Sequence, residues 1–153
     1  MRKVIIISTV ILIIIITIIL ITKQVKEYYS SDPILAKLKE KIRPIFVSDK
    51  PFTGHLEKLN HINILDKIEL YKGDKSYTID KQKVFLCLKD ENNEYYNMNM
   101  LVYVSTHELS HVICESVGHT EEFHNIFNEL LNIAVKKGIY DPTIPVISDY
   151  CEY

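Results

Sequence analysis

The apolar run from Val4 to Thr22 most restricts the folds open to this chain, because it contains only Val, Ile, Leu, Ser and Thr. As a helix with a rise of about 1.5 Å per residue it is about 28 Å long, close to the ~30 Å hydrocarbon core of a bilayer. The run therefore predicts an uncleaved single-pass transmembrane helix, with residues 1–23 as the anchor and residues 4–22 in the lipid. A cleaved signal peptide is the alternative, but its apolar stretch is shorter and ends at small residues, which the chain after Thr22 lacks.

Lysines and cysteines bear on which side of the membrane the rest of the chain occupies. Arg2 and Lys3 precede the run, whereas more basic residues follow it, namely Lys23, Lys26, Lys37, Lys39 and Lys41. This excess favours a cytosolic C-terminal domain. Cys87, Cys114 and Cys151 form an odd and scattered set, unlike the disulfide framework of a small secreted domain, so we expect three free thiols.

Residues 32–153 have the length of one domain. Asp32 is a suitable N-cap and Pro33 a suitable first residue for a helix that should end near Arg43-Pro44. Residues 45–59 lack clear periodicity and are expected to be mostly loop. Short runs rich in Ile, Val, Tyr and Phe then predict the strands of a small, mostly antiparallel sheet, at residues 62–64, 68–71, 77–79 and 84–88.

Two long helices are predicted after the sheet. Asn97 should cap a helix over residues 98–117, and Thr120 should cap a second one that ends at Lys136-Lys137-Gly138. The second helix has apolar residues at the spacing of a core-facing stripe, namely Phe123, Ile126, Phe127, Leu130, Leu131 and Ala134. The predicted fold class is therefore α+β, with the helix over residues 98–117 at its centre and an irregular tail after Asp141.

The central helix carries the string His107-Glu108-Leu109-Ser110-His111. Residues four apart lie on one face of a helix, so both histidines can bind one cation. Glu108 projects from the adjoining face, where it can hold a metal-activated water, as in zinc peptidases. Gly118 allows the helix to end, and His119 can return as a third ligand. The sequence therefore predicts Zn²⁺ on His107, His111 and His119, with Glu108 as the catalytic base.

Other residues near the string compete for these roles. Glu115 lies four residues beyond His111 on the predicted helix and is the rival third ligand, or an acceptor for an imidazole N–H. His124 could assist from the turn after His119, whereas Cys114 is expected to be a buried thiol. The string can also arise by chance on an amphipathic helix. Candidates for stabilising an oxyanion are Tyr95, Tyr96, Tyr103 and Tyr140.

These residues resemble the WLM domain of the Wss-like metalloproteases, which are related to the SprT/Spartan group. The family pattern is a His-Glu-x-x-His helix, a short spacer and Gly-His-x-x-x-Phe, which matches residues 107–112 and 118–123 here. More narrowly, the chain resembles short membrane-anchored metallopeptidases of nucleocytoplasmic large DNA viruses. This closer resemblance covers roughly Lys75 to Cys151 and depends on Thr78-Ile79-Asp80-Lys81, Leu86-Cys87-Leu88 and Gly138-Ile139-Tyr140-Asp141-Pro142.

The resemblance implies a zincin-like metallopeptidase domain that binds zinc through the three histidines and hydrolyses a protein or peptide substrate. Members of the WLM and SprT families digest proteins crosslinked to DNA, which is one alternative function here. A non-catalytic membrane or virion protein that zinc holds together is another. The net charge of −2 and the absence of a basic segment argue against a nucleic-acid partner. The leading prediction is a membrane-anchored zinc metalloprotease of a viral or host-cell membrane.

Overall fold

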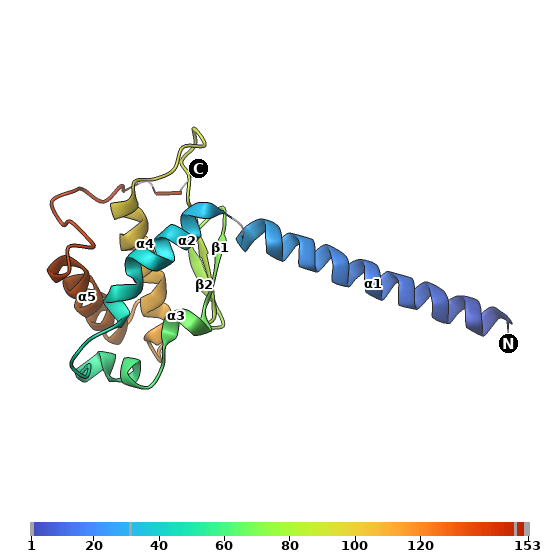
Figure 1. Cartoon of the computed structure of the whole chain (residues 1–153), viewed down its shortest axis with the longest axis horizontal. Helices are drawn as coiled ribbons and strands as arrows, with labels where there is room; N and C mark the ends of the chain where they lie inside the picture. The colour runs from blue at the N-terminus through green and yellow to red at the C-terminus, as the bar shows by residue number, and fades with distance from the viewer. Residues whose placement is uncertain (1, 31, 149, 152–153) are drawn as a thin grey trace.

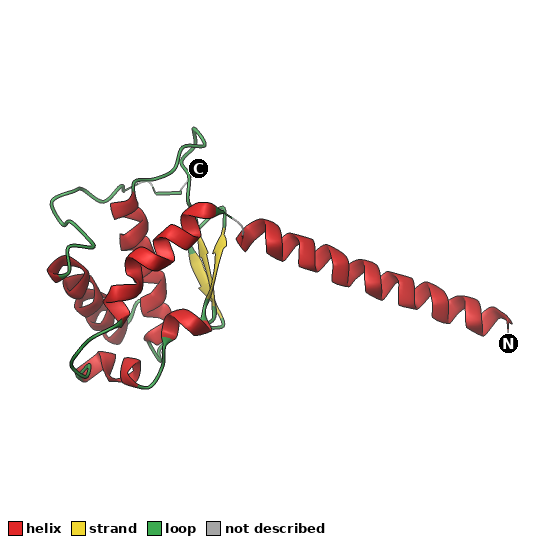
Figure 2. Ribbon diagram, in the orientation of Figure 1, coloured by secondary structure: helices red, strands yellow, loops and turns green. Residues whose placement is uncertain are grey.

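The computed structural model of the chain describes residues 2–30, 32–148 and 150–151. Its first helix, α1 (Arg2–Ser30), extends from the domain as a single rod (Figures 1 and 2). The window Ile6–Lys23 is long and apolar enough to cross a membrane, and none of it is buried in the structure. The predicted apolar helix is thus confirmed and continues to Ser30. Met1 and residues 152–153, at the ends of the predicted ranges, and residue 149 in the tail lie outside the described residues.

The chain enters the domain through α2 (Pro33–Ile42), which begins and ends where predicted. The Asp32 carboxylate accepts a hydrogen bond of 3.1 Å from the backbone N–H of Ile34, which satisfies one of the free donors of the first turn. Residues 45–59 are less irregular than expected, because they include parts of two 3₁₀ helices, η1 (Arg43–Phe46) and η2 (Gly54–Asn60). Buried apolar side chains hold both of them against the core, namely Ile45, Phe46, Leu56 and Leu59.

The sheet has three strands, β1 (Glu69–Lys72), β2 (Tyr77–Ile79) and β3 (Lys83–Leu86), in the order β1-β3-β2. Strand β3 pairs antiparallel with β2 and parallel with β1, so the sheet is mixed and the expectation of a mostly antiparallel sheet is wrong. The predicted strand at residues 62–64 is also wrong, since Ile64 begins a short helix, α3 (Ile64–Lys67). Ile64, Leu65 and Ile68 are buried at the spacing of a helical face rather than in alternation.

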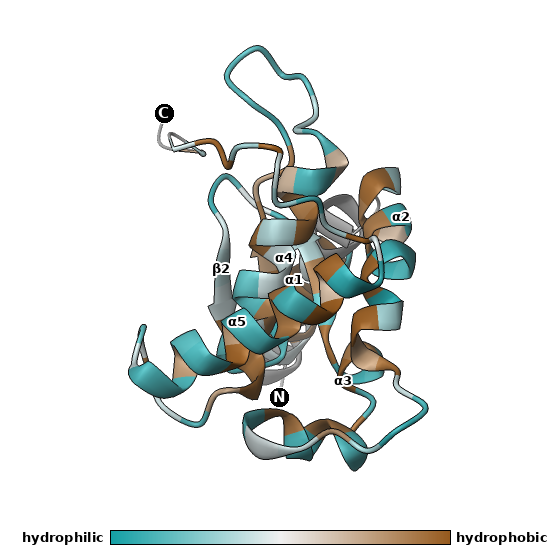
Figure 3. Cartoon of the chain, turned by 90° about the vertical axis from the view of Figure 1, so that its left-hand side faces the viewer, coloured by the Kyte–Doolittle hydropathy of each residue, from teal (hydrophilic) through white to brown (hydrophobic). Residues whose placement is uncertain are grey.

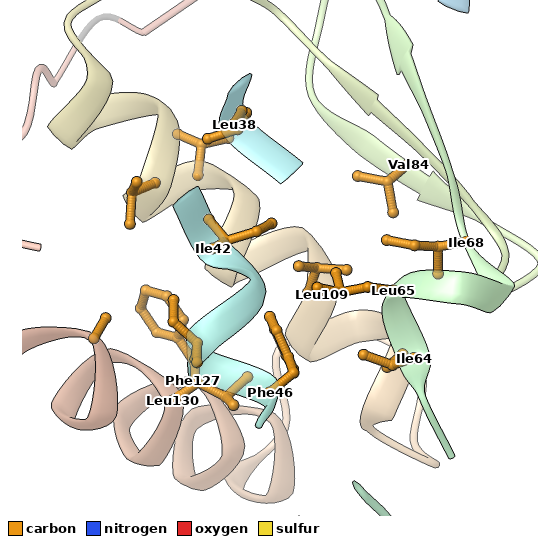
Figure 4. Close-up of a cluster of buried hydrophobic side chains, with 14 of the residues drawn as sticks. Leu38, Ile42, Phe46, Ile64, Leu65, Ile68, Val84, Leu109, Phe127 and Leu130 are labelled. Carbon is orange, nitrogen blue, oxygen red and sulfur yellow. The ribbon is translucent and has the colours of Figure 1, made fainter. Parts of the chain in front are cut away.

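Helix α4 (Met98–Ile113) lies at the centre of the domain, as predicted, and packs against α2, α5 and strands β2 and β3. Asn97 caps it by accepting a hydrogen bond of 2.9 Å from the N–H of Met100. Figure 4 shows Leu109 of this helix in one cluster with Ile42 and Leu65. The predicted end at Val117 is wrong, because Cys114 is already extended, with ψ of 135°.

Helix α5 (Glu121–Lys136) follows a seven-residue connection, which consists of residues 114–119 and the N-cap Thr120, and it has the predicted bounds. Thr120 accepts a hydrogen bond of 3.4 Å from the N–H of Phe123, and Gly138, with φ of 65°, turns the chain away at the other end. In Figure 3 the ribbon of α5 carries both hydrophobic and hydrophilic stretches. The buried side chains of α5 are those of the predicted stripe, except that Leu131 is half-buried. The connection at residues 114–119, here called the His119 loop, is therefore held between two packed helices.

A disulfide bond joins Cys87, just after β3, to Cys151 in the tail. The prediction of three free thiols is wrong for these two, whereas Cys114 is free and buried as expected. The two cysteines are 64 positions apart, and only the fold brings their Cα atoms within 6.3 Å, a distance typical of disulfides. The bond fixes the end of the irregular tail, which returns from α5 toward the sheet, where the C-terminus is marked in Figure 1.

Candidate metal centre

The structure brings the three predicted histidine ligands together. His107 and His111 lie one turn apart on α4, with ring centroids 5.1 Å apart, and His119 approaches them from the His119 loop. One nitrogen from each ring can be chosen so that all three lie within 4.8 Å of one another. Nε2 of His119 is 3.0 Å from Nε2 of His107. The geometry places three donors around one point, at the C-terminal end of α4.

This donor set fits a divalent transition metal. Tetrahedral zinc with Zn–N bonds of about 2.0–2.1 Å separates its ligand nitrogens by about 3.3 Å. The 3.0 Å between His107 and His119 and the 4.8 Å limit for the whole group lie on either side of that value, so side-chain rotations that move a ligand nitrogen by at most about 1.5 Å suffice. Imidazole suits zinc, copper, iron and nickel, and three neutral donors with an open fourth position are typical of catalytic zinc.

Phe123, in the first turn of α5, forms a floor beneath the three imidazoles. Its ring stacks on His111 at a centroid distance of 4.2 Å and meets the rings of His119 and His107 edge-on at 4.7 Å and 4.9 Å. The side chain is 1% exposed. The sequence identified Phe123 as a core residue and as part of the Gly-His-x-x-x-Phe match, but not as the support that restricts the ligand rings to a few orientations.

Glu108 lies beside the ligands rather than among them. It lines the same pocket of about 590 Å³ as the three histidines, but it does not belong to the group of clustered ligand atoms. Its side chain is 5% exposed. The Thr78 hydroxyl lies 2.8 Å from Oε2 of Glu108 and 3.0 Å from its backbone oxygen, and can donate to either. Strand β2 thereby positions the carboxylate, a contact that sequence reasoning did not identify.

Burial shifts the protonation of this site. It raises the pKa of the Glu108 carboxyl to about 7, and the hydrogen bond from Thr78 partly opposes that rise. Burial also lowers the pKa of His107 to about 4, and repulsion from the imidazoles of His111, His119 and His124 adds to the effect. The pKa of His111 is lowered by burial and then by His119. His107 and His111 therefore favour the neutral form, which is the form that binds metals.

The structure removes the rivals for the third ligand position. Glu115 was considered because of its predicted place on the helix, but α4 ends at Ile113 and Glu115 instead forms an exposed ion pair with Lys58. The ring of His124 is stacked 6.3 Å from that of His119, outside the ligand group. Among the candidate tyrosines, Tyr103 is the one whose pocket also includes His107 and Glu108.

Two charged side chains fix the His119 loop from opposite sides. The Glu122 carboxylate accepts hydrogen bonds from the backbone N–H groups of Glu115 and Ser116, at 3.0 Å and 3.2 Å, and from the Ser116 hydroxyl. Lys81 donates to the backbone oxygens of Cys114 and Glu115. Both residues were overlooked in the sequence, where Glu122 resembles an ordinary first-turn acid and Lys81 an ordinary turn residue.

We expect Glu122→Ala to weaken zinc binding by about 10-fold, the lower end of the range for residues that orient metal ligands. The variant frees the His119 loop, so His119 must lose more motion when it binds the metal. Zinc affinity measured by competition with a chromophoric chelator checks this, and Glu121→Ala, in the same helical turn, is the matched control. Equal affinities of the two variants would contradict the positioning role.

The hydrogen bonds from Ser116 and the Glu115 backbone hold the pKa of Glu122 at about 2. A carboxyl with a lowered pKa in the folded state stabilises that state at pH values above its ordinary pKa, and this contribution is lost as the pH falls toward 2. The clamp on the His119 loop is therefore fully formed at neutral pH.

Comparisons with known proteins yield viral relatives. The chain is 42% identical over 134 residues to the "uncharacterized protein 136R" of Invertebrate iridescent virus 6, covering 83% of this chain and 75% of that protein. It is 40% identical over 102 residues to the "uncharacterized protein 042R" of Invertebrate iridescent virus 3, covering 66% and 64% of the two chains. A third relative, the "uncharacterized protein R325" of Acanthamoeba polyphaga mimivirus, is 35% identical over 102 residues, or 62% of this chain and 49% of that one. No family model matches the chain, and no solved structure matches it.

Proposed function

The chain belongs to the viral protein family of 136R from Invertebrate iridescent virus 6, and we propose that it is a zinc-dependent metallopeptidase attached to a membrane. The single observation that carries this proposal is the clustering of His107, His111 and His119 beside a buried glutamate in one pocket. We also propose that the domain is a zincin-like domain of the WLM type, on the basis of the motif at residues 107–112 and 118–123.

Each residue of the site has a distinct task in the proposed reaction. The three histidines would hold Zn²⁺, which when bound lowers the pKa of a water toward ~7 and polarises a substrate carbonyl. Glu108 takes a proton from the attacking water and passes it to the leaving amine nitrogen, so that one peptide bond is broken and one water consumed. Thr78 keeps the carboxylate pointing into the pocket. Tyr103 is the candidate to donate a hydrogen bond to the developing oxyanion.

Strand β2 supports a polypeptide as the substrate. It pairs with β3 on one side and is the last strand in the order β1-β3-β2, so in the described part of the chain no strand pairs with its other edge. Ser76, Tyr77 and Thr78 line the pocket of the three histidines, so that edge borders the site. An extended peptide can add to the edge of a sheet through backbone hydrogen bonds, which gives binding with little dependence on sequence.

The number of ligands favours catalysis over a purely structural zinc site. Structural zinc is closed by four protein ligands, whereas catalytic zinc keeps a position for water. Among the described residues, no fourth His, Cys, Asp or Glu joins the ligand group. Digestion of DNA-crosslinked proteins receives less support, because the net charge is −2 and a DNA-binding surface needs an excess of basic residues.

The membrane attachment is proposed through residues 4–22 of α1, in which the apolar side chains from Ile6 to Ile21 are exposed. Two features give opposite indications of the side of the membrane on which the domain lies. The lysines after the apolar run favour a cytosolic domain, whereas disulfides such as Cys87–Cys151 persist in oxidising compartments. The disulfide requires oxidised thiols, whereas the lysine rule is statistical, so the proposal places the domain in an oxidising compartment.

The test uses the full chain purified in detergent. We expect one zinc per chain by elemental analysis, and hydrolysis of a quenched fluorescent peptide library that stops with 1,10-phenanthroline and returns when zinc is added. Removing the metal also removes the ligand contacts, so the thermal midpoint of the domain should fall and recover in parallel. A chain that binds no zinc, or a zinc-loaded chain that cleaves no library member, would overturn the proposal.

A further inference from the structure

A second pocket, of about 400 Å³, adjoins the metal site on the side of the tail. It shares Ser76, His107 and Glu108 with the pocket of the three histidines, so the two hollows adjoin each other at the proposed base. One wall comes from α4, with Met100, Tyr103 and Val104. The opposite wall is made by the tail, through Val146 and Ile147.

The tail is fixed at both ends of this wall. At the far end, Cys151 is bonded to Cys87, and the Tyr150 hydroxyl donates to the backbone oxygen of Cys87. At the near end, Asn99 of α4 forms a pair of hydrogen bonds with the backbone of Asp141, at 3.0 Å and 2.7 Å. These two ties fix where the tail leaves α4 and where it returns to the sheet, and Val146 and Ile147 lie on the stretch between them.

Its lining is mostly apolar, yet the tail side chains that border it are partly open. Val146 is 42% exposed and Ile147 is 40% exposed, so each keeps apolar surface that water covers when the pocket is empty. Lys75 and Ser76 are polar residues of the lining on the side of the sheet. Lys75 would repel a basic side chain.

We propose that this tail-walled pocket binds an apolar side chain of the substrate next to the scissile bond, and that Val146 and Ile147 set that preference. The proposal rests on the proposed peptidase function and adds the substrate class. A leucine, methionine or phenylalanine side chain would bury apolar surface against both walls while its backbone crosses Glu108. A lysine in the same place would lose its hydration and face Lys75.

The test compares quenched fluorescent peptides that differ only in the residues flanking the cleaved bond. For the full chain with zinc, we expect kcat/KM to be at least about 10-fold higher with leucine or phenylalanine than with lysine, a ratio typical of one apolar subsite. Ile147→Asp should lower kcat/KM for the apolar peptides by about 10-fold and raise it for the lysine peptide. Ile144→Asp is the matched control, since Ile144 is a tail residue of equal exposure, 40%, that does not line the pocket.

Cys151→Ser provides an independent variant, because it releases the tail and leaves the ligands in place. We expect it to reduce the preference for apolar peptides while zinc content stays at one per chain. A chain that cleaves peptides with no preference, or an Ile147→Asp variant that behaves as Ile144→Asp does, would overturn the subsite and leave the peptidase proposal intact. A zinc-loaded chain without any cleavage would remove both.

Discussion

Glu108→Gln is expected to lower peptide hydrolysis by about 10²–10⁴-fold, the usual contribution of a general base. The glutamine oxygen can still accept the hydrogen bond from Thr78, so the side chain keeps its place in the pocket. It cannot accept a proton from water at neutral pH. Because Glu108 stands outside the ligand group, zinc content should stay at one per chain. Kinetic assays with a cleavable peptide and elemental analysis of the same preparation measure both quantities.

The control for this variant is Glu115→Gln, which makes the same chemical change at the exposed ion pair with Lys58. We expect it to keep kcat and zinc content within about twofold, in line with the small energies of surface ion pairs. If Glu108→Gln retained full activity, the base would have to be sought elsewhere. If it lost its zinc, the glutamate would be acting on the metal rather than on the water.

His119→Ala should reduce zinc affinity by more than about 100-fold, since it removes a metal–ligand bond and leaves two ligands on one helix. Hydrolysis should fall with the zinc content. Isothermal titration of the apo-protein with zinc measures this loss, and thermal unfolding with and without zinc shows whether the metal still stabilises the fold. The variant separates a three-ligand centre from a simple pair of helical histidines.

His124→Ala is the matched comparison, one turn into α5 and with its ring 6.3 Å from that of His119. It should keep zinc affinity within a few-fold of the unaltered chain, because it lies outside the group of converging donors. The proposal requires the two variants to differ. Equal losses would mean that either histidine can serve, and no loss in His119→Ala would remove the predicted third ligand.

Local patterns predicted the parts of the fold that local interactions determine. The N-caps Asp32, Asn97 and Thr120 were identified because their side chains satisfy donors two or three residues away. The positions of His107 and His111 followed from helical spacing alone. The position of His119 beside them was harder to predict, because it required that α4 end before this residue and that the chain then turn back toward the helix.

Contacts between distant segments were not predictable in the same way. Strand β3 pairs parallel with β1 because it lies between β1 and β2 in the sheet. The residue pattern within a strand does not indicate which strand will be its neighbour. The early end of α4 at Ile113 left Glu115 off the helix, and no proline or glycine in the preceding turn marks that end. The bond between Cys87 and Cys151 is a further case, because its two halves approach each other only once the tail has crossed the domain.

That bond also encloses the three proposed metal ligands and the proposed base in one covalent loop. The residues between its two cysteines include α4, the His119 loop and α5. Because the bond closes a loop of 64 residues, it lowers the conformational entropy of the unfolded chain and so stabilises the folded state by about 4 kcal/mol. The His119 loop is accessible to proteases, because the Val117 side chain in it is 91% exposed. A nick at that point would leave two pieces that still travel together, with His107 and His111 on one and His119 on the other. The centre could thus outlast damage to its own backbone.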